Sequence, residues 1–268
     1  MKSRGFIIPG MFLAGYLLLN ILEVSAADSK NTKSSQKEPW ELSLATEVWE
    51  PVPPVVSLSD AGIPSDAIIL FDGRNLDQWQ AADSAEEAKW RLVDGAMEVV
   101  AKTGDIKTKA SFCDIQLHLE WMTPTNVTGQ DGKPLESQAR NNSGVFLQER
   151  YEVQVLDSYQ SKTYSNGQAG AIYKQSIPLV NATFAPGKWQ TYDIIFNAPK
   201  FKSNKKLLKP GYITVLHNGV LVQNHFEIQG ATAWIGKPVY GAHGCAPLRL
   251  QDHGNPVRFK NIWVRKLD

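Results

Sequence analysis

The sequence predicts an all-β protein built from two packed antiparallel sheets, a β-sandwich or jelly roll. Three observations predict this: one strand in which polar and apolar residues alternate, two tight-turn hairpins, and about a dozen short strand-like segments separated by turns. No segment has the period of a long amphipathic helix. In a sandwich the apolar strand faces meet inside, so the polar face of a curved sheet can form a groove.

The strand signals are strongest in three places. Polar and apolar residues alternate from 112 to 121, which predicts a strand with one face in the core. Asp94-Gly95 and Asn218-Gly219 each separate two strand-like segments, and both pairs tolerate the positive φ that tight hairpin turns require. Further strands are expected at 144–149, 151–156, 169–173, 189–197, 248–253 and 256–266.

The N-terminal 26 residues have the pattern of a signal peptide. Lys2 and Arg4 precede an apolar run from 6 to 22, and small residues stand at 24–26, before a cleavage point at Ala27. An uncleaved membrane anchor is the alternative, but the run is short for a bilayer span. We therefore expect an exported protein, periplasmic or extracellular, without a stable membrane span after cleavage.

Residues 27–64 differ in composition from the rest of the chain. They are polar at first and rich in proline from Pro39 onward. Such a segment favours an extended strap that lays Trp40 and Trp49 on a domain surface. Residues 65–268 remain for one β domain.

Charge and cysteine content limit the possible partners. Without residues 1–26 the chain has as many acidic as basic side chains and no basic run, which argues against a nucleic-acid partner. A small uncharged molecule such as a carbohydrate fits better. After export, Cys113 and Cys245 could form a disulfide or remain two buried thiols, and their spacing does not decide between these.

The most informative polar pattern lies between residues 151 and 158. With the odd-numbered residues in the core, Glu152 and Gln154 share the outer face of the strand. Asp157 has the wrong parity for that face unless a β-bulge redirects it. The spacing is similar to that of the acidic strand of laminarinases and lichenases, except that Gln154 replaces their central Asp.

Other polar side chains could face the same groove. Arg140 and Asn142 precede a strand and could hydrogen-bond a sugar. Gln251 and His253 share one face, and His253 is the best histidine candidate for proton transfer near neutral pH. Glu120 lies on the polar face of the strand at 112–121. No phosphate loop, zinc motif or serine nucleophile elbow is present, so we expect no cofactor, with a divalent metal in the groove left open.

In order along the chain, a set of short motifs resembles the 3-keto-disaccharide hydrolase domain family. These motifs include the segments at 70–79, 106–109, 142–145, 151–158, 170–173, 250–254 and 257–263. The resemblance covers about residues 68–268, apart from two insertions at 125–138 and 200–210. It implies a concanavalin A-like β-sandwich and the cleavage of glycosides that are already oxidised at C3.

The implied chemistry assigns a role to each candidate residue. A ketone at C3 acidifies the C2 proton, so a base can remove it and expel the substituent at C1; Glu152 or His253 would be the base and the other the acid. The remaining side chains would stabilise the enolate oxygen (Arg140, Lys109 or Gln251), orient the sugar (Asn142, Gln154 and Tyr173) or support the catalytic pair (Asp157 and Glu120).

Two alternatives to a 3-keto-glycoside hydrolase or lyase remain open. A β-glucanase-type glycosidase would need a second carboxylate about 5–5.5 Å from Glu152 for a retaining mechanism. A non-catalytic carbohydrate-binding module would need aromatic and amide side chains but no acid–base pair.

Overall fold

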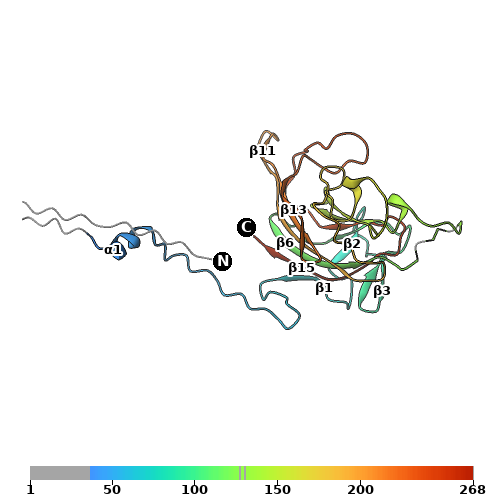
Figure 1. Ribbon diagram of the computed structural model, residues 1–268, viewed down its shortest axis with the longest axis horizontal. Helices are drawn as coiled ribbons and strands as arrows, with labels where there is room; N and C mark the ends of the chain where they lie inside the picture. The colour runs from blue at the N-terminus through green and yellow to red at the C-terminus, as the bar shows by residue number, and fades with distance from the viewer. Residues whose placement is uncertain (1–36, 127, 130, 268) are drawn as a thin grey trace, which may run out of the picture. The chain divides into compact units, whose positions relative to one another are not determined.

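The computed structural model describes residues 37–126, 128–129 and 131–267. The predicted signal peptide and most of the polar segment that follows it lie outside these residues. The chain divides into two compact units, one that ends at Pro54 and one that begins at Val55 (Figure 1). In the described part of the chain, no helix is long and apolar enough to cross a membrane.

The N-terminal unit contains a short helix where an extended strap was expected. Helix α1 (Pro39–Ser43) is followed by the 3₁₀ turn η1 (Leu44–Thr46). Pro39 stands at the start of α1, where its missing N–H is no loss, and the backbone N–H of Glu38 donates to the Glu41 carboxylate at 3.1 Å. Trp40 and Trp49 are 64% and 79% exposed. Packing of these tryptophans on the β domain stays a prediction.

The second unit is built from antiparallel sheets, which confirms the all-β prediction. The larger sheet has the strand order β13-β12-β9-β6-β15-β4-β3, with β1 also paired to β15 (Figure 1). Its strands are β1 (Ile68–Phe71), β3 (Arg91–Val93), β4 (Ala96–Glu98), β6 (Ile115–Met122), β9 (Gln190–Asn197), β12 (Tyr212–His217), β13 (Val220–Glu227) and β15 (Arg258–Lys266).

The smaller sheet has the order β2-β5-β14-β7-β8, which makes β8 an edge strand. Its strands are β2 (Trp79–Ala81), β5 (Ile106–Thr108), β7 (Ser143–Leu147), β8 (Tyr151–Val155) and β14 (Arg249–Leu250). A separate hairpin, β10 (Lys200–Phe201) with β11 (Leu207–Lys209), occupies the insertion at 200–210.

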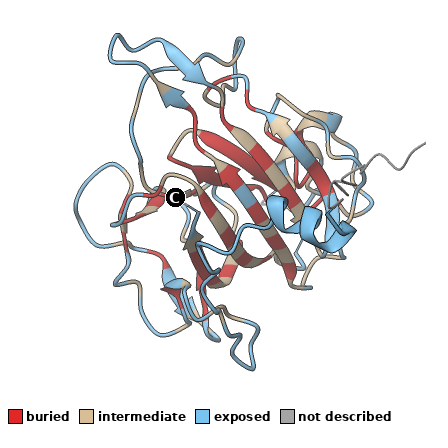
Figure 2. Ribbon diagram, turned by 90° about the vertical axis from the view of Figure 1, so that its left-hand side faces the viewer, coloured by how far each residue is buried: buried red, intermediate tan, exposed pale blue. Residues whose placement is uncertain are grey.

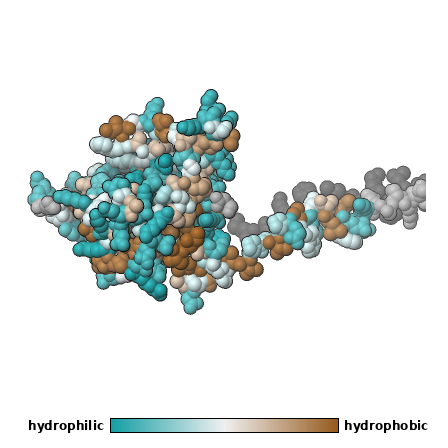
Figure 3. Space-filling model, turned by 180° about the vertical axis from the view of Figure 1, so that it is seen from behind, coloured by the Kyte–Doolittle hydropathy of each residue, from teal (hydrophilic) through white to brown (hydrophobic). Residues whose placement is uncertain are grey.

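The core lies between the two sheets and follows the predicted alternation. Along β6 every second side chain is buried, which appears as alternating bands on the strands in Figure 2. Tyr151, Val153 and Val155 of β8 belong to the same hydrophobic core. The even-numbered residues of β8 therefore face away from the core. The face of the β domain seen in Figure 3 is mostly hydrophilic, with hydrophobic side chains in scattered groups.

Both predicted hairpin turns are present. Asp94 and Gly95 have φ of 52° and 73° between β3 and β4, and Asn218 and Gly219 have φ of 53° and 76° between β12 and β13. Positive φ at both central residues matches the right-handed twist of the flanking strands.

The strand expected at 169–173 is wrong, because this segment turns instead of running straight. Gly170 has a φ of 79°, and Ile172 forms only isolated bridges. The segment still covers the free edge of β8: the N–H of Gly170 donates to the carbonyl oxygen of Gln154, and the N–H of Tyr173 donates to that of Glu152. It thereby places Tyr173 beside β8.

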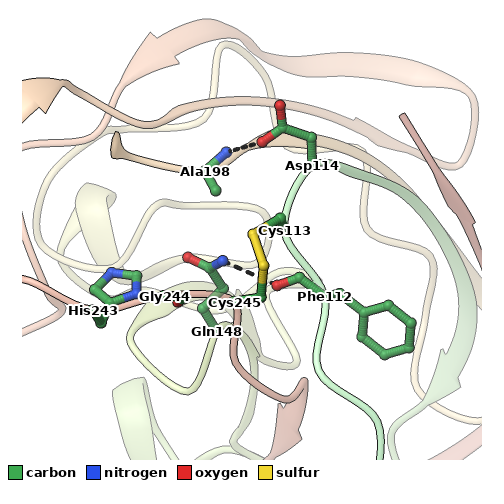
Figure 4. The surroundings of a disulfide bond; sticks show 8 residues. All are labelled: Phe112, Cys113, Asp114, Gln148, Ala198, His243, Gly244 and Cys245. Carbon is green, nitrogen blue, oxygen red and sulfur yellow. Dashed lines mark hydrogen bonds between the residues drawn. A yellow bond between two sulfur atoms is a disulfide. The ribbon is translucent and has the colours of Figure 1, made fainter. Parts of the chain in front are cut away.

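A disulfide between Cys113 and Cys245 joins the two sheets. Cys113 precedes β6 of the larger sheet, and Cys245 precedes β14 of the smaller one (Figure 4). Polar contacts surround the bond: the Gln148 amide donates to the carbonyl oxygen of Phe112 at 3.0 Å. The bond closes a loop with a sequence separation of 132 residues.

Removal of this disulfide should destabilise the β domain. A cross-link over so long a loop restricts the unfolded chain strongly, so the Cys113→Ser/Cys245→Ser double variant should lose about 3–5 kcal/mol of unfolding free energy. Guanidinium denaturation without reductant measures this loss. Reductant should lower the stability of the wild type to that of the variant and leave the variant unchanged. If the wild type and the double variant had the same denaturation midpoint without reductant, that result would contradict the cross-link.

Candidate active site

A cavity of about 690 Å³ lies on the outer face of the smaller sheet, within the size range of small-ligand sites. Six of the ten candidate site residues from the sequence line this cavity: Asn142, Glu152, Gln154, Tyr173, Gln251 and His253. The other lining residues are Gln138, Ala139, Phe146, Tyr164, Thr232 and Trp234.

The pairing of β7 and β8 positions the floor of the cavity. Phe146 lies opposite Glu152, and Gly144 lies opposite Gln154. A side chain at 144 would collide with the carboxyl group of Glu152, because a Cβ atom there would stand 2.6 Å from Glu152 Oε1. Gly144 therefore leaves the space in which this carboxyl lies.

Glu152 is the ionisable group at the bottom of the cavity. Its side chain is only 4% exposed, and its carboxyl has no hydrogen-bonding partner within the described residues. Burial raises the pKa of Glu152 to about 8; the charge of Arg249 opposes this shift and that of Asp105 adds to it. The carboxyl is therefore mainly protonated at neutral pH and can donate a proton.

Asn142 and Gln154 form a fixed uncharged part of the floor. The Gln154 amide donates to Asn142 Oδ1 at 2.7 Å, and the Asn142 amide donates to the carbonyl oxygen of Gln138 at 2.9 Å. The backbone N–H of Asn142 donates to Asn255 Oδ1 at 3.0 Å. These bonds determine which way both amides point.

The walls of the cavity carry groups that can act on a bound molecule. The hydroxyls of Tyr164 and Tyr173 are 2.6 Å apart, so one proton of the pair remains free to be donated into the cavity. Burial and the bond to Tyr164 raise the pKa of Tyr173, which keeps it a hydrogen-bond donor. Within the described residues, the side chains of Gln251 and His253 have no protein partner, and His253 is exposed at the cavity.

Sequence reasoning missed six of the lining residues. For Phe146 a signal existed, because the parity of the strand at 144–149 places it on the same face as Gly144. Thr232 and Trp234 come from a segment without strand periodicity, and Tyr164 precedes the 3₁₀ turn η3 (Ser165–Gly167). No local pattern places these loop residues beside β8.

Arg140 and Asp157 bind each other instead of facing the cavity. Arg140 Nε donates to Asp157 Oδ2 at 2.7 Å, and the Asp157 side chain is fully buried. No β-bulge redirects Asp157 within β8, because β7 and β8 pair in regular register and β8 ends at Val155. The pair instead fastens the loop that enters β7 to the chain that leaves β8.

Glu120 and Lys109 also lie away from the cavity. Glu120 stands on β6 of the larger sheet, where Asn261 donates to it at 3.1 Å and Lys260 is 3.3 Å away. Lys109 lines a separate cavity of about 160 Å³ beside Trp79. Strand periodicity identifies the polar face of β6 but not the sheet to which β6 belongs, so the prediction that Glu120 faces the groove is wrong. The role of Lys109 follows from the family resemblance alone, and the structure places this side chain at the other cavity.

The described residues contain no group of three or more His, Cys, Asp or Glu side chains arranged to hold a metal ion. In the cavity, Glu152 and His253 are the lining residues of these types. The arrangement therefore offers a proton donor, a second proton-transfer group and uncharged hydrogen-bonding partners.

The model of one family, the 3-keto-alpha-glucoside-1,2-lyase-like domain, matches residues 66–265, a range that includes every residue lining the cavity. The crystal structure of a proposed glycosyl hydrolase from Parabacteroides distasonis ATCC 8503 is 50% identical in sequence. It superposes with a TM-score of 0.78 over 84% of this chain and 96% of that one.

Two further proposed glycosyl hydrolases from the same organism share the fold. One is 21% identical with a TM-score of 0.55 over 76% of this chain and 94% of its own. The other is 22% identical with a TM-score of 0.50 over 75% and 99%. No curated protein matches the sequence. On the match over residues 66–265, the chain belongs to the family of 3-keto-alpha-glucoside-1,2-lyase-like domains, which places it among carbohydrate-active proteins.

Proposed function

We propose that this protein cleaves glycosides whose sugar carries a ketone at C3, by acid–base elimination at C2 and C1. The observation that carries the proposal is the Glu152 carboxyl: it is buried, has no hydrogen-bonding partner among the described residues, has a pKa that burial raises to about 8, and lines the same cavity as His253. The family match supports the substrate class.

The cavity contains a group for each step of such a reaction. His253 acts as the base that removes the proton from C2, and the electrons move toward the C3 oxygen. Gln251 can donate a hydrogen bond to that oxygen as it becomes negative. The C1–O bond then breaks, and Glu152 donates its proton to the leaving oxygen. Water adds to the resulting enone to give the free 3-keto sugar.

The electrostatics of the cavity fit an uncharged sugar. Among the described residues, its lining contains neither lysine nor arginine, and Glu152, with a pKa of about 8, is mainly neutral at pH 7. A sugar carboxylate would have no cationic partner there, and transfer of an unpaired charge into such a site is costly. Asn142, Gln154 and Gln251 can instead hydrogen-bond hydroxyl groups.

The two alternatives fit this cavity less well. A two-carboxylate glycosidase needs a second acid beside Glu152, and no other Asp or Glu lines the cavity among the described residues. A binding module has no use for a buried carboxylic acid without a partner, because burying one costs stability.

Export of the protein belongs to the same proposal. The N-terminal pattern that suggested a signal peptide lies outside the described residues. The disulfide between Cys113 and Cys245 is consistent with an oxidising compartment, such as the periplasm or the extracellular space.

The first prediction concerns the substrate. The purified protein should release sugar and aglycone from a 3-keto glucoside and leave the unoxidised parent intact, because only the ketone acidifies C2. Product analysis by NMR measures both reactions. Cleavage of the parent at a comparable rate would favour the two-carboxylate glycosidase, and cleavage of neither would favour the binding module.

The second prediction concerns the role of Glu152. With a 3-keto methyl glucoside, Glu152→Gln should lower kcat/KM by about 10²–10⁴-fold, the span usual for loss of a general acid. With a 3-keto 4-nitrophenyl glucoside the loss should be below about tenfold, because 4-nitrophenolate leaves without a proton.

Glu120→Gln is the matched control for this experiment, because it makes the same substitution on the other sheet, away from the cavity. Its activity should equal that of the wild type on both substrates. An equal loss with both leaving groups in Glu152→Gln would show that Glu152 does not act as the acid.

The third prediction concerns stability and pH. The pKa of Glu152 is about 8 in the folded protein and about 4.5 in the unfolded chain, so the folded state binds this proton more tightly. The contribution of this bound proton to the free energy of unfolding is fully present below pH 4.5 and is lost as the pH rises through 8. The unfolding free energy of Glu152→Gln, measured relative to that of the wild type, should therefore increase by roughly 3–5 kcal/mol between pH 5 and pH 9. Urea denaturation at both values tests this, and a constant difference would contradict the raised pKa.

A further inference from the structure

Aromatic side chains form one wall of the cavity and part of its rim. Trp234 lines the cavity and is nevertheless 72% exposed, and Tyr164 beside it in the wall is partly exposed as well. A solvent-exposed indole at the mouth of a cavity is apolar surface available to a ligand. The hydrogen-bonding groups of the floor, by contrast, are Glu152, Gln154 and Asn142, which are buried.

The aromatic wall is fixed in place through Lys174. Lys174 Nζ donates to the carbonyl oxygen of Trp234 at 2.6 Å. The same ammonium group lies 5.6 Å from the ring centre of Tyr164 and 5.8 Å from that of Tyr173, within the range of cation–π attraction. One cation thus holds the Trp234 backbone and both tyrosine rings together.

The segment that carries Trp234 is also tied to the strand of the proposed acid. Thr232 Oγ1 accepts a hydrogen bond from the backbone N–H of Glu152 at 3.0 Å, and the N–H of Thr232 donates to the carbonyl oxygen of Arg150 at 2.8 Å. Trp234 follows two residues later. Its position relative to Glu152 is therefore set by the backbone and not by a free loop.

Polar groups beside the indole already have contacts within the protein. The Tyr164 hydroxyl contacts that of Tyr173, Lys174 binds the Trp234 carbonyl, and the Thr232 hydroxyl binds the N–H of Glu152. A planar ring without hydroxyls loses no hydrogen bonds when it stacks on an indole.

We propose that Trp234 and Tyr164 form the subsite for the leaving group, and that the preferred glycosides carry an uncharged aromatic aglycone. This inference rests on the proposed function, since Glu152 must reach the oxygen that joins sugar and aglycone. Trp234 determines specificity through stacking and takes no part in proton transfer.

The test compares benzyl and methyl 3-keto glucosides. Both release simple alcohols of similar acidity, so the leaving-group chemistry is matched and the aromatic ring is the difference. The wild type should favour the benzyl compound in kcat/KM by roughly 5- to 20-fold, the scale of one aromatic contact with its buried area. Trp234→Ala should remove most of this preference, so that the ratio of kcat/KM between the benzyl and methyl compounds falls toward one, and Trp234→Phe should retain part of it.

Ile235→Ala is the matched control. Ile235 is the next residue, is 78% exposed and does not line the cavity, so its removal should leave the benzyl preference unchanged. Since both side chains are exposed, neither change should prevent folding. An equal benzyl preference in the wild type and Trp234→Ala would overturn the inference.

A binding measurement separates this inference from the proposed function. By calorimetry, the unoxidised benzyl glucoside should bind the wild type roughly 5- to 20-fold more tightly than it binds Trp234→Ala, without any turnover. If that difference appears although no 3-keto glucoside is cleaved, the aromatic subsite stands and the proposed reaction fails. If the wild type cleaves 3-keto glucosides but binds the benzyl glucoside no more tightly than Trp234→Ala does, the proposed reaction stands and the aromatic subsite is refuted.

Discussion

The placement of the Glu152 carboxyl depends on the alternation of side chains along β8. Tyr151, Val153 and Val155 fill the space between the sheets, so Glu152 and Gln154 must point to the opposite face. Burial of those three apolar side chains contributes about 1.5–3 kcal/mol each, and a one-residue shift in register would move all of them to the outer face. The core therefore determines where the acid stands.

The neighbours of Glu152 then determine its protonation. Gly144 provides space for the carboxyl, and no described side chain offers it a hydrogen bond. A carboxylate in that position would be desolvated without compensation, so the neutral acid is favoured. The contacts around the site hold this arrangement: the ion pair of Arg140 with Asp157 fastens the loop before β7, and the edge of β8 is covered by the segment that contains Tyr173.

Much of this could be predicted from the sequence, because strand periodicity and turn residues are local signals. The alternation in β6, the two hairpin turns and the outward direction of Glu152 and Gln154 follow from it directly. Periodicity identifies the polar face of β6 but not the sheet to which that strand belongs, so it does not separate Glu120 from the residues of the cavity. Nor does it reveal ion pairs between residues far apart in the sequence, such as that of Arg140 with Asp157. Trp234 lies in a loop whose position depends on contacts with β8 and Lys174, which no local pattern encodes.

The reaction at C2 is the central claim, and hydrogen exchange at that carbon tests it most directly. In heavy water, the protein should place deuterium at C2 of the sugar released from a 3-keto glucoside, because the proton is removed there and a solvent proton returns when water adds. The Glu152→Gln variant should still exchange C2 of a 3-keto methyl glucoside while it cleaves that compound slowly, since His253 acts as the base. Released sugar without deuterium at C2, beyond the exchange seen without enzyme, would contradict the mechanism.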